Sequence, residues 1–149
     1  MEKLFFKLVS NDEIEEIFFK IIQRKEILSW EIKAYKTKLL LELAKEYKKY
    51  DLGMQIHIGA MRNNNTRMYN KLGPDIGTDS MGDYNYAREL SALLNELDKN
   101  DELPKTILYC INLKENEVLA SMIGNFQSDE RPGKMQFGSI WWFLDQKKG

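Results

Sequence analysis

The stretch Gly53-Met-Gln-Ile-His-Ile-Gly59 decides the fold, because the spacing of apolar residues changes here from a helical period to strict alternation. Every second residue between the two glycines is apolar, and the residues between them are Gln55 and His57. Alternation of this kind is typical of a strand whose two faces meet different surroundings. The stretch therefore predicts a strand with one apolar face and one polar face.

The residues before this strand predict two helices. Apolar residues recur at the spacing of one helical face up to Ile22, and Ser10 with Glu13 has the form of a capping box at the start. A longer helix is expected from about Ser29 to Tyr50, with lysines and glutamates on its solvated side. Its apolar stripe, which we expect to pack, consists of Tyr35, Leu39, Leu43 and Tyr47.

The residues after the first strand predict a loop, then further helices and strands. Residues 60–84 are rich in Asn, Gly and Asp and predict a long loop, the kind that often carries function. A helix follows, then a strand over Thr106–Ile111, a helix capped by Asn112 with Glu115, and a third strand over Lys134–Ile140. Strands separated by helices form parallel sheets with right-handed crossovers, so the expected fold class is α/β.

The length and composition predict one domain. At 149 residues, 43% hydrophobic and 30% charged, we expect a single segment, helical over 1–52 and βαβαβ over 53–149. A polar face on the first strand suits the interior of a barrel better than an open sheet, so the three strands are expected to belong to an incomplete α/β barrel. Three strands leave two open edges, and we therefore expect self-association.

Charge and cysteine content exclude several classes of partner and compartment. The formal net charge of -1 favours neither nucleic acid nor an anionic membrane as a partner. No apolar stretch is long enough to span a bilayer, and the N-terminus is too short and charged for a signal peptide. The single cysteine, Cys110, lies in an apolar run, which indicates a buried thiol and a reducing, cytoplasmic compartment.

Candidate binding residues follow the first strand. His57 stands near its carboxyl end, where ligands of parallel sheets bind, and could be a general base, a metal ligand, a substrate contact or a structural histidine. The run from Arg62 to Arg67, which includes Asn63, Asn64 and Asn65, offers two guanidiniums and three amides. Such a set suits a carboxylate and several hydroxyls, and a solvated loop with left-handed asparagines is the alternative.

Two further groups have a functional and an ordinary interpretation. Asp75, Asp79 and Asp83 recur every four residues and could bind a hard cation, although turn and capping roles are more common. Trp141 and Trp142 follow the third strand and could form an apolar wall against a sugar ring, although aromatic clusters are more often core. These residues indicate a partial α/β barrel that binds a polar, anionic small molecule, and they specify no reaction.

Three segments resemble the uronate isomerases of the amidohydrolase superfamily. They are His57-Ile-Gly-Ala-Met-Arg-Asn-Asn-Asn-Thr-Arg67 with Gly73-Pro-Asp75, then Leu103-Pro-Lys-Thr-Ile-Leu-Tyr-Cys110, then Gln136-Phe-Gly-Ser139 with Trp141-Trp-Phe and Asp145-Gln-Lys147. The segments occur in the order found in the family. An asparagine triplet behind His-Ile-Gly, followed at a distance by Trp-Trp-Phe, is far more specific than any one short motif.

The resemblance implies a (β/α)8 barrel enzyme that interconverts glucuronate with fructuronate and galacturonate with tagaturonate. The chain would cover about a third of the family chain and supply the fifth, sixth and seventh strands, with His57 at the end of the fifth. Superfamily relatives use a histidine there to bind metal, which makes His57 a candidate zinc ligand. The residues expected to bind the hexuronate are His57, Arg62, Asn63, Asn64, Asn65, Arg67, Trp141 and Trp142.

The same resemblance implies that the residues of the chemical step lie elsewhere. The family's His-x-His pair, which holds zinc where one is bound, has no counterpart because His57 is the only histidine. The family's Asp-Ser-Arg segment would lie beyond Gly149. We therefore expect an isomerase fragment, inactive alone, with no assigned catalytic base and no required cofactor. A non-catalytic truncated domain is the alternative, and a metal-dependent hydrolase of the superfamily is disfavoured because the matched motifs are those of the isomerases.

Overall fold

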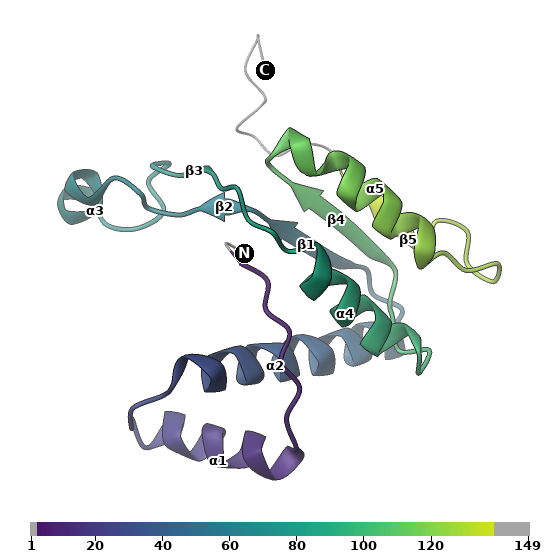
Figure 1. Ribbon diagram of the computed structural model, residues 1–149, viewed down its shortest axis with the longest axis horizontal. Helices are drawn as coiled ribbons and strands as arrows, with labels where there is room; N and C mark the ends of the chain where they lie inside the picture. The colour runs from purple at the N-terminus through teal and green to yellow at the C-terminus, as the bar shows by residue number, and fades with distance from the viewer. Residues whose placement is uncertain (1–2, 139–149) are drawn as a thin grey trace. The chain divides into compact units, whose positions relative to one another are not determined.

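The computed structural model describes residues 3–138 (Figure 1). These residues form two compact units. The first unit contains residues 3–4, 54–87 and 106–138, and the second contains residues 5–53 and 88–105. The candidate site residues His57, Arg62 and Arg67 all belong to the first unit.

The first unit is built on a three-stranded parallel sheet in the order β1-β4-β5. The strands are β1 (Met54–Ile58), β4 (Thr106–Cys110) and β5 (Met135–Phe137). In the register of the sheet, Leu108 of the central strand lies between Ile56 and Phe137. The predicted α/β class and the three parallel strands are confirmed, although β5 begins one residue later than predicted and Ile140 lies outside the described residues.

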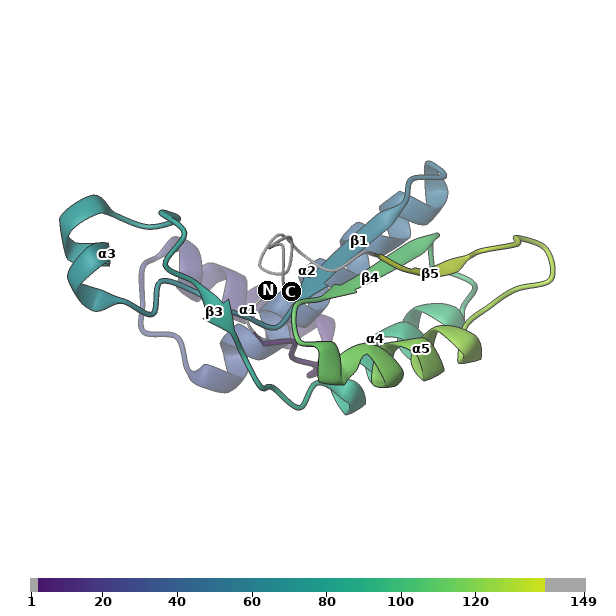
Figure 2. The same cartoon turned by 90° about the horizontal axis from the view of Figure 1, so that it is seen from above.

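The two faces of this sheet differ as the alternation predicted. The buried side chains of the apolar face are Met54, Ile56, Ile58, Thr106, Leu108, Cys110 and Met135. Helix α5 (Asn116–Asn125) follows the short 3₁₀ helix η1 (Leu113–Glu115) and packs beside β5. Figure 2 shows α5 on one side of the three strands. The opposite face carries Gln55 and His57 of β1. Gln55 is exposed and His57 is half-buried.

The long segment between β1 and the next helix has a structure of its own. Its elements are β2 (Ala60–Met61), α3 (Thr66–Leu72) and β3 (Ser80–Met81), and the two strands pair antiparallel. Gly82 N–H donates to the Gly59 carbonyl at 2.8 Å, and Asn112 Nδ2 donates to the Gly82 carbonyl at 3.2 Å. The two ends of this excursion are therefore tied to the carboxyl ends of β1 and β4, and α3 lies at its far end (Figure 1).

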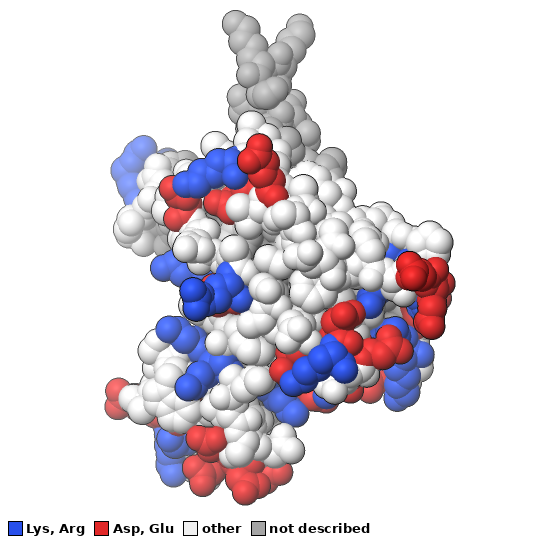
Figure 3. All heavy atoms as spheres, turned by 45° about the vertical axis from the view of Figure 1, so that its right-hand side comes forward, with Lys and Arg blue, Asp and Glu red and all other residues white. Residues whose placement is uncertain are grey.

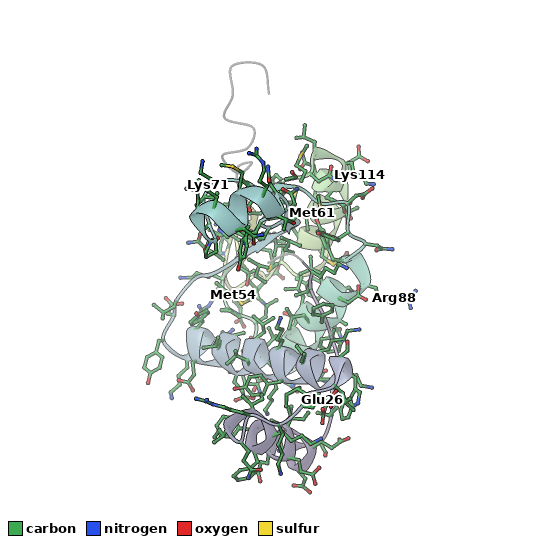
Figure 4. All side chains as sticks on the ribbon, turned by 90° about the vertical axis from the view of Figure 1, so that its left-hand side faces the viewer. Glu26, Met54, Met61, Lys71, Arg88 and Lys114 are labelled. Atoms are coloured by element: carbon green, nitrogen blue, oxygen red, sulfur yellow. The ribbon has the colours of Figure 1, made fainter. Side chains whose placement is uncertain are left out.

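The second unit is helical. Its helices are α1 (Asn11–Ile22), α2 (Ser29–Lys49) and all but the first residue of α4 (Ala87–Asp98). Ser10 Oγ accepts from Glu13 N–H at 3.2 Å, and the Glu13 carboxylate accepts from Ser10 N–H at 2.8 Å, which confirms the predicted capping box. Figure 4 shows α1 and α2 side by side, joined near Glu26.

The stripe predicted on α2 is not its buried face. The buried residues of this helix are Glu31, Ala34, Thr37, Leu41 and Ala44, whereas Leu39 and Leu43 are exposed. The prediction was wrong because it weighted large apolar side chains, and small ones allow closer approach of the backbone. Thr37 Oγ1 also accepts from Lys7 N–H at 3.0 Å and donates to the Lys33 carbonyl at 2.9 Å, which binds the N-terminal segment to this face.

The face of the molecule drawn in Figure 3 carries charges of both signs. On the face shown in Figure 3, Lys and Arg side chains are interspersed with Asp and Glu side chains, in keeping with the formal net charge of -1. Among the described residues, no helix combines the length and the hydropathy needed to cross a membrane.

Candidate functional site

His57 lies on the polar face of β1, near the carboxyl end of the strand. Parallel pairing places Tyr109 of β4 directly beside it, and the two rings stack with centroids 4.3 Å apart and planes 14° apart. Burial lowers the pKa of His57 below its ordinary value of 6.5, and the positive charge of Arg62 lowers it further. The imidazole is therefore neutral at pH 7, with one nitrogen able to donate and the other able to accept.

Tyr109 is held on its other sides as well. Its hydroxyl donates to Gln55 Oε1 at 3.1 Å, on the same face of the sheet as His57. Directly after β5, Gly138 N–H donates to the Leu108 carbonyl at 2.9 Å, which brings its backbone close to the Tyr109 ring. A Cβ atom at Gly138 would lie only 2.0 Å from Tyr109 Cε1, so the ring occupies space that a glycine leaves open.

Arg62 follows β2 and pairs with a buried carboxylate. Its Nη1 lies 2.7 Å from Asp79 Oδ2, and the other oxygen of Asp79 accepts from Asn63 N–H at 2.8 Å. The Asp79 side chain is 2% exposed and that of Arg62 is 35% exposed. Charge-assisted bonds to a buried carboxylate fix one edge of a guanidinium. Asp79 therefore orients Arg62 while leaving part of it within reach of solvent.

The three asparagines bond within their own loop. Asn63 has a left-handed φ of 50°, as one interpretation of the sequence anticipated, and its Oδ1 accepts from Asp75 N–H at 3.0 Å. Asn64 Nδ2 donates to Ser80 Oγ at 2.6 Å. Asn65 Oδ1 accepts a backbone N–H of α3 at 3.1 Å and caps that helix. These amides shape the excursion that carries Arg62.

The remaining candidates are dispersed. Arg67 is exposed on α3, Asp75 occupies a turn with φ 58°, and Asp83 pairs with Lys114 at 2.5 Å. No group of three or more His, Cys, Asp and Glu side chains within residues 3–138 could hold a metal ion. Those residues alone therefore do not fit a zinc site. Trp141 and Trp142 lie outside the described residues.

Sequence reasoning missed the surroundings of His57. Tyr109 was assigned only to an apolar strand, although alternation from the buried Cys110 places it on the opposite, polar face. The missing information was the register between β1 and β4, which no local pattern encodes. The prediction for Cys110 itself is confirmed, since its thiol is buried and burial raises its pKa.

The family model described as glucuronate isomerase matches residues 1–149, which is the whole chain. The chain belongs to the glucuronate isomerase family. The uronate isomerase of Clostridium perfringens is 53% identical over 149 residues, which are 100% of this chain and 32% of that protein. The uronate isomerase of Actinobacillus succinogenes is 58% identical over 119 residues, which are 80% of this chain and 26% of that protein. The chain thus spans a third or less of these relatives.

Solved structures of glucuronate and uronate isomerases share the fold. The crystal structure of the Thermotoga maritima uronate isomerase superposes with a TM-score of 0.83 at 23% identity, covering 98% of this chain and 30% of that one. The glucuronate isomerase of Caulobacter crescentus gives 0.78 at 26% identity, covering 96% of this chain and 28% of that one. Strands β1, β4 and β5 are therefore part of a TIM-type barrel, as predicted.

Proposed function

We propose that the chain forms part of the substrate-binding wall of an aldose–ketose isomerase that interconverts glucuronate with fructuronate and galacturonate with tagaturonate. The observation that carries the proposal is the position of His57 near the carboxyl end of β1 and of Arg62 directly after β2, in a chain that the glucuronate isomerase family model matches throughout. Barrel enzymes bind substrates at the carboxyl ends of their strands, and both residues lie at that end.

The chemistry of the two residues suits a sugar acid. Arg62, oriented by Asp79, presents a planar cationic fork to the substrate carboxylate. His57, neutral at pH 7, exchanges hydrogen bonds with a substrate hydroxyl or carbonyl. In this proposal Arg67 adds positive charge, the asparagine triplet shapes the loop and contributes amide contacts, and Trp141 with Trp142 forms an apolar wall against the sugar ring.

Binding, rather than proton transfer, is the contribution that we assign to this chain. Transfer of a proton between C1 and C2 requires a base within hydrogen-bond reach, and His57 is placed here as a substrate contact. Zinc, where the complete enzyme binds it, would supply Lewis-acid chemistry, and His57 is the described residue that we propose as one of its ligands. Because residues 3–138 do not fit a complete zinc site, further ligands have to come from elsewhere.

A segment exchange tests this function. The matching 149 residues of the Clostridium perfringens uronate isomerase are replaced by this chain, and keto-sugar formation from glucuronate and galacturonate is followed. We expect the chimera to retain turnover. Arg62→Gln in the chimera should raise KM at least tenfold. The substitution removes the hydrogen bond between the guanidinium and the substrate carboxylate, and a hydrogen bond to a charged group contributes about 1.5–3 kcal/mol. A folded chimera without turnover on either hexuronate would overturn the proposal.

The chain alone provides the complementary measurement. Assayed on glucuronate and galacturonate with and without added zinc, the 149-residue chain should give no keto-sugar. Turnover by the chain alone would contradict the assignment of a binding role and would identify a base within these residues.

We also propose that the chain associates with itself and functions in the cytoplasm, with hexuronates as its ligands. Self-association is supported by β1 and β5, which among the described residues pair only with β4, and by exposed apolar side chains on α1. The cytoplasmic location is supported by the buried thiol of Cys110, which forms no disulfide within the described residues.

A further inference from the structure

A row of residues crosses the polar face of the sheet at the level of His57. His57 of β1 pairs with Tyr109 of β4, Gly138 directly follows β5 and bonds to the Leu108 carbonyl next to Tyr109, and Gln55 lies two residues before His57. The Tyr109 ring stands between the imidazole and the Gly138 backbone. Each neighbour meets a different part of Tyr109: His57 stacks on the ring, Gly138 lies closest to the ring atoms Cε1 and Cδ1, and Gln55 bonds to the hydroxyl.

These contacts leave the Tyr109 ring little freedom. The hydrogen bond to Gln55 Oε1 fixes the direction of the hydroxyl, and Gly138 provides the space on the far side. The ring torsions of tyrosine and histidine both have broad energy minima, so neighbouring groups decide how far each ring turns. A near-parallel stack at 4.3 Å restricts the torsion of His57, because rotation of the imidazole would drive its edge into the tyrosine ring. The Tyr109 ring, held by Gln55 and Gly138, therefore limits the orientations open to His57.

We propose that Tyr109 is a positioning residue that fixes the orientation in which His57 meets the substrate, with Gln55 and Gly138 holding Tyr109 in place. The identity of the substrate rests on the function proposed above, whereas the orientation of His57 does not. The tyrosine touches no reacting atom in this scheme and acts only through the imidazole.

Nuclear magnetic resonance on the chain measures this orientation directly. His57 is the only histidine of the 149 residues, so its two imidazole C–H signals are free of overlap from other histidines. We expect nuclear Overhauser effects between the imidazole and the Tyr109 ring protons, and an upfield shift of the imidazole signals from the tyrosine ring current. An unmodified chain without these effects would overturn the proposal.

Substitutions separate positioning from general support of the fold. Tyr109→Phe should keep the upfield shift, because the ring remains, whereas Tyr109→Leu removes the ring current and the ring protons in any case and gives the reference signals of an unstacked imidazole. Gly138→Ala should reproduce the leucine result without removing the ring, since the added Cβ displaces it. Tyr69→Leu, at an exposed position on α3, is the matched control and should change nothing.

The outcomes are distinct from those of the activity assay. If the folded Tyr109→Leu and Gly138→Ala chains keep the imidazole signals of the unmodified chain, Tyr109 does not orient His57. Should the leucine variant not fold, the unmodified chain, Tyr109→Phe and Gly138→Ala still decide. No sugar acid is present in these measurements, so a chimera without turnover leaves their result unaffected.

Discussion

His57 is expected to gain its proton only below its ordinary pKa of 6.5. Its pKa is lowered from 6.5 by burial and by the charge of Arg62. An imidazole titration followed by magnetic resonance should therefore give a midpoint below 6.5, and Arg62→Gln should move it upward. A midpoint at or above 6.5 would contradict the burial of this side chain on the polar face of β1.

The same shift makes stability depend on pH. The unfolded chain binds the proton of His57 more tightly than the folded chain does, so unfolding takes up protons. The contribution of His57 is fully present above its unfolded pKa of 6.5 and is lost as pH falls through the lower, folded pKa. Denaturant titrations at several pH values should show a slope in this window that is absent in His57→Gln.

Asp79 is expected to hold the Arg62 loop in shape. Asp79→Asn preserves size but removes the charge that accepts from Arg62 and from Asn63 N–H. Loss of one charge-assisted bond costs about 2 kcal/mol. Hydrogen exchange at the Asn63 amide should accelerate accordingly. Asp83→Asn is the control, since Asp83 pairs with Lys114 and should leave that amide protected.

At the scale of elements, β4 carries the core of the sheet. Leu108 lies on the central strand and is fully buried, so Leu108→Ala should lower the free energy of unfolding by about 2–5 kcal/mol. Leu113→Ala removes the same atoms from an exposed position in η1 and should cost little. Denaturant unfolding of both variants measures the difference, and equal losses would refute the placement of Leu108.

Helices α1 and α2 are connected by Glu31. Its carboxylate accepts from Lys20 Nζ at 2.5 Å and from Leu28 N–H at 2.7 Å, and the lysine bond followed by the backbone bond lowers its pKa below 4.5. This stabilisation is present above pH 4.5 and is lost as pH falls through the lowered pKa. Glu31→Gln should lower the melting temperature at neutral pH more than Glu26→Gln does. Glu26 is exposed in the loop that joins the two helices (Figure 4).

The elements themselves were largely predictable, and their contacts were not. Local signals placed the start of α1 at Ser10 and the polar face of β1 at His57, because capping and alternation depend on neighbours in sequence. The buried face of α2 and the role of Tyr109 depend on partners distant in sequence. A pattern of apolar residues cannot distinguish the exposed Leu39 from the buried Ala34, since only the packing partner selects the face.

At the scale of the whole molecule, hydrogen bonds within one loop position some residues of the candidate site, and the strands of the barrel position others. The segment from His57 to Arg67 was identified by its composition, and the structure shows that Asn63 and Asn65 bond within the loop. The sequence suggested cation binding or turn and capping roles for the three aspartates of this loop, and it did not indicate that one of them pairs with Arg62. Burial distinguishes them, since Asp79 is enclosed and Asp83 is exposed.

Within residues 3–138, apolar side chains on α1 are exposed. Phe19 and Ile22 are 58% and 60% exposed, and contiguous apolar surface of this kind usually meets a partner. Relatives such as the Clostridium perfringens enzyme are about three times as long, whereas this chain has only a second copy of itself available in solution. We therefore expect sedimentation to show concentration-dependent association.

A double variant tests the surface responsible. Phe19→Lys with Ile22→Lys places two charges on the apolar face and should shift the chain toward monomer, because burying an unpaired ammonium in an interface is costly. Gln23→Lys adds a charge at an exposed polar position at the end of α1 and should leave association unchanged. A chain that sediments as a monomer at every concentration would exclude self-association. Association that persists in a folded double variant would instead place the contact away from α1, with the open edges of β1 and β5 as the next surfaces to substitute.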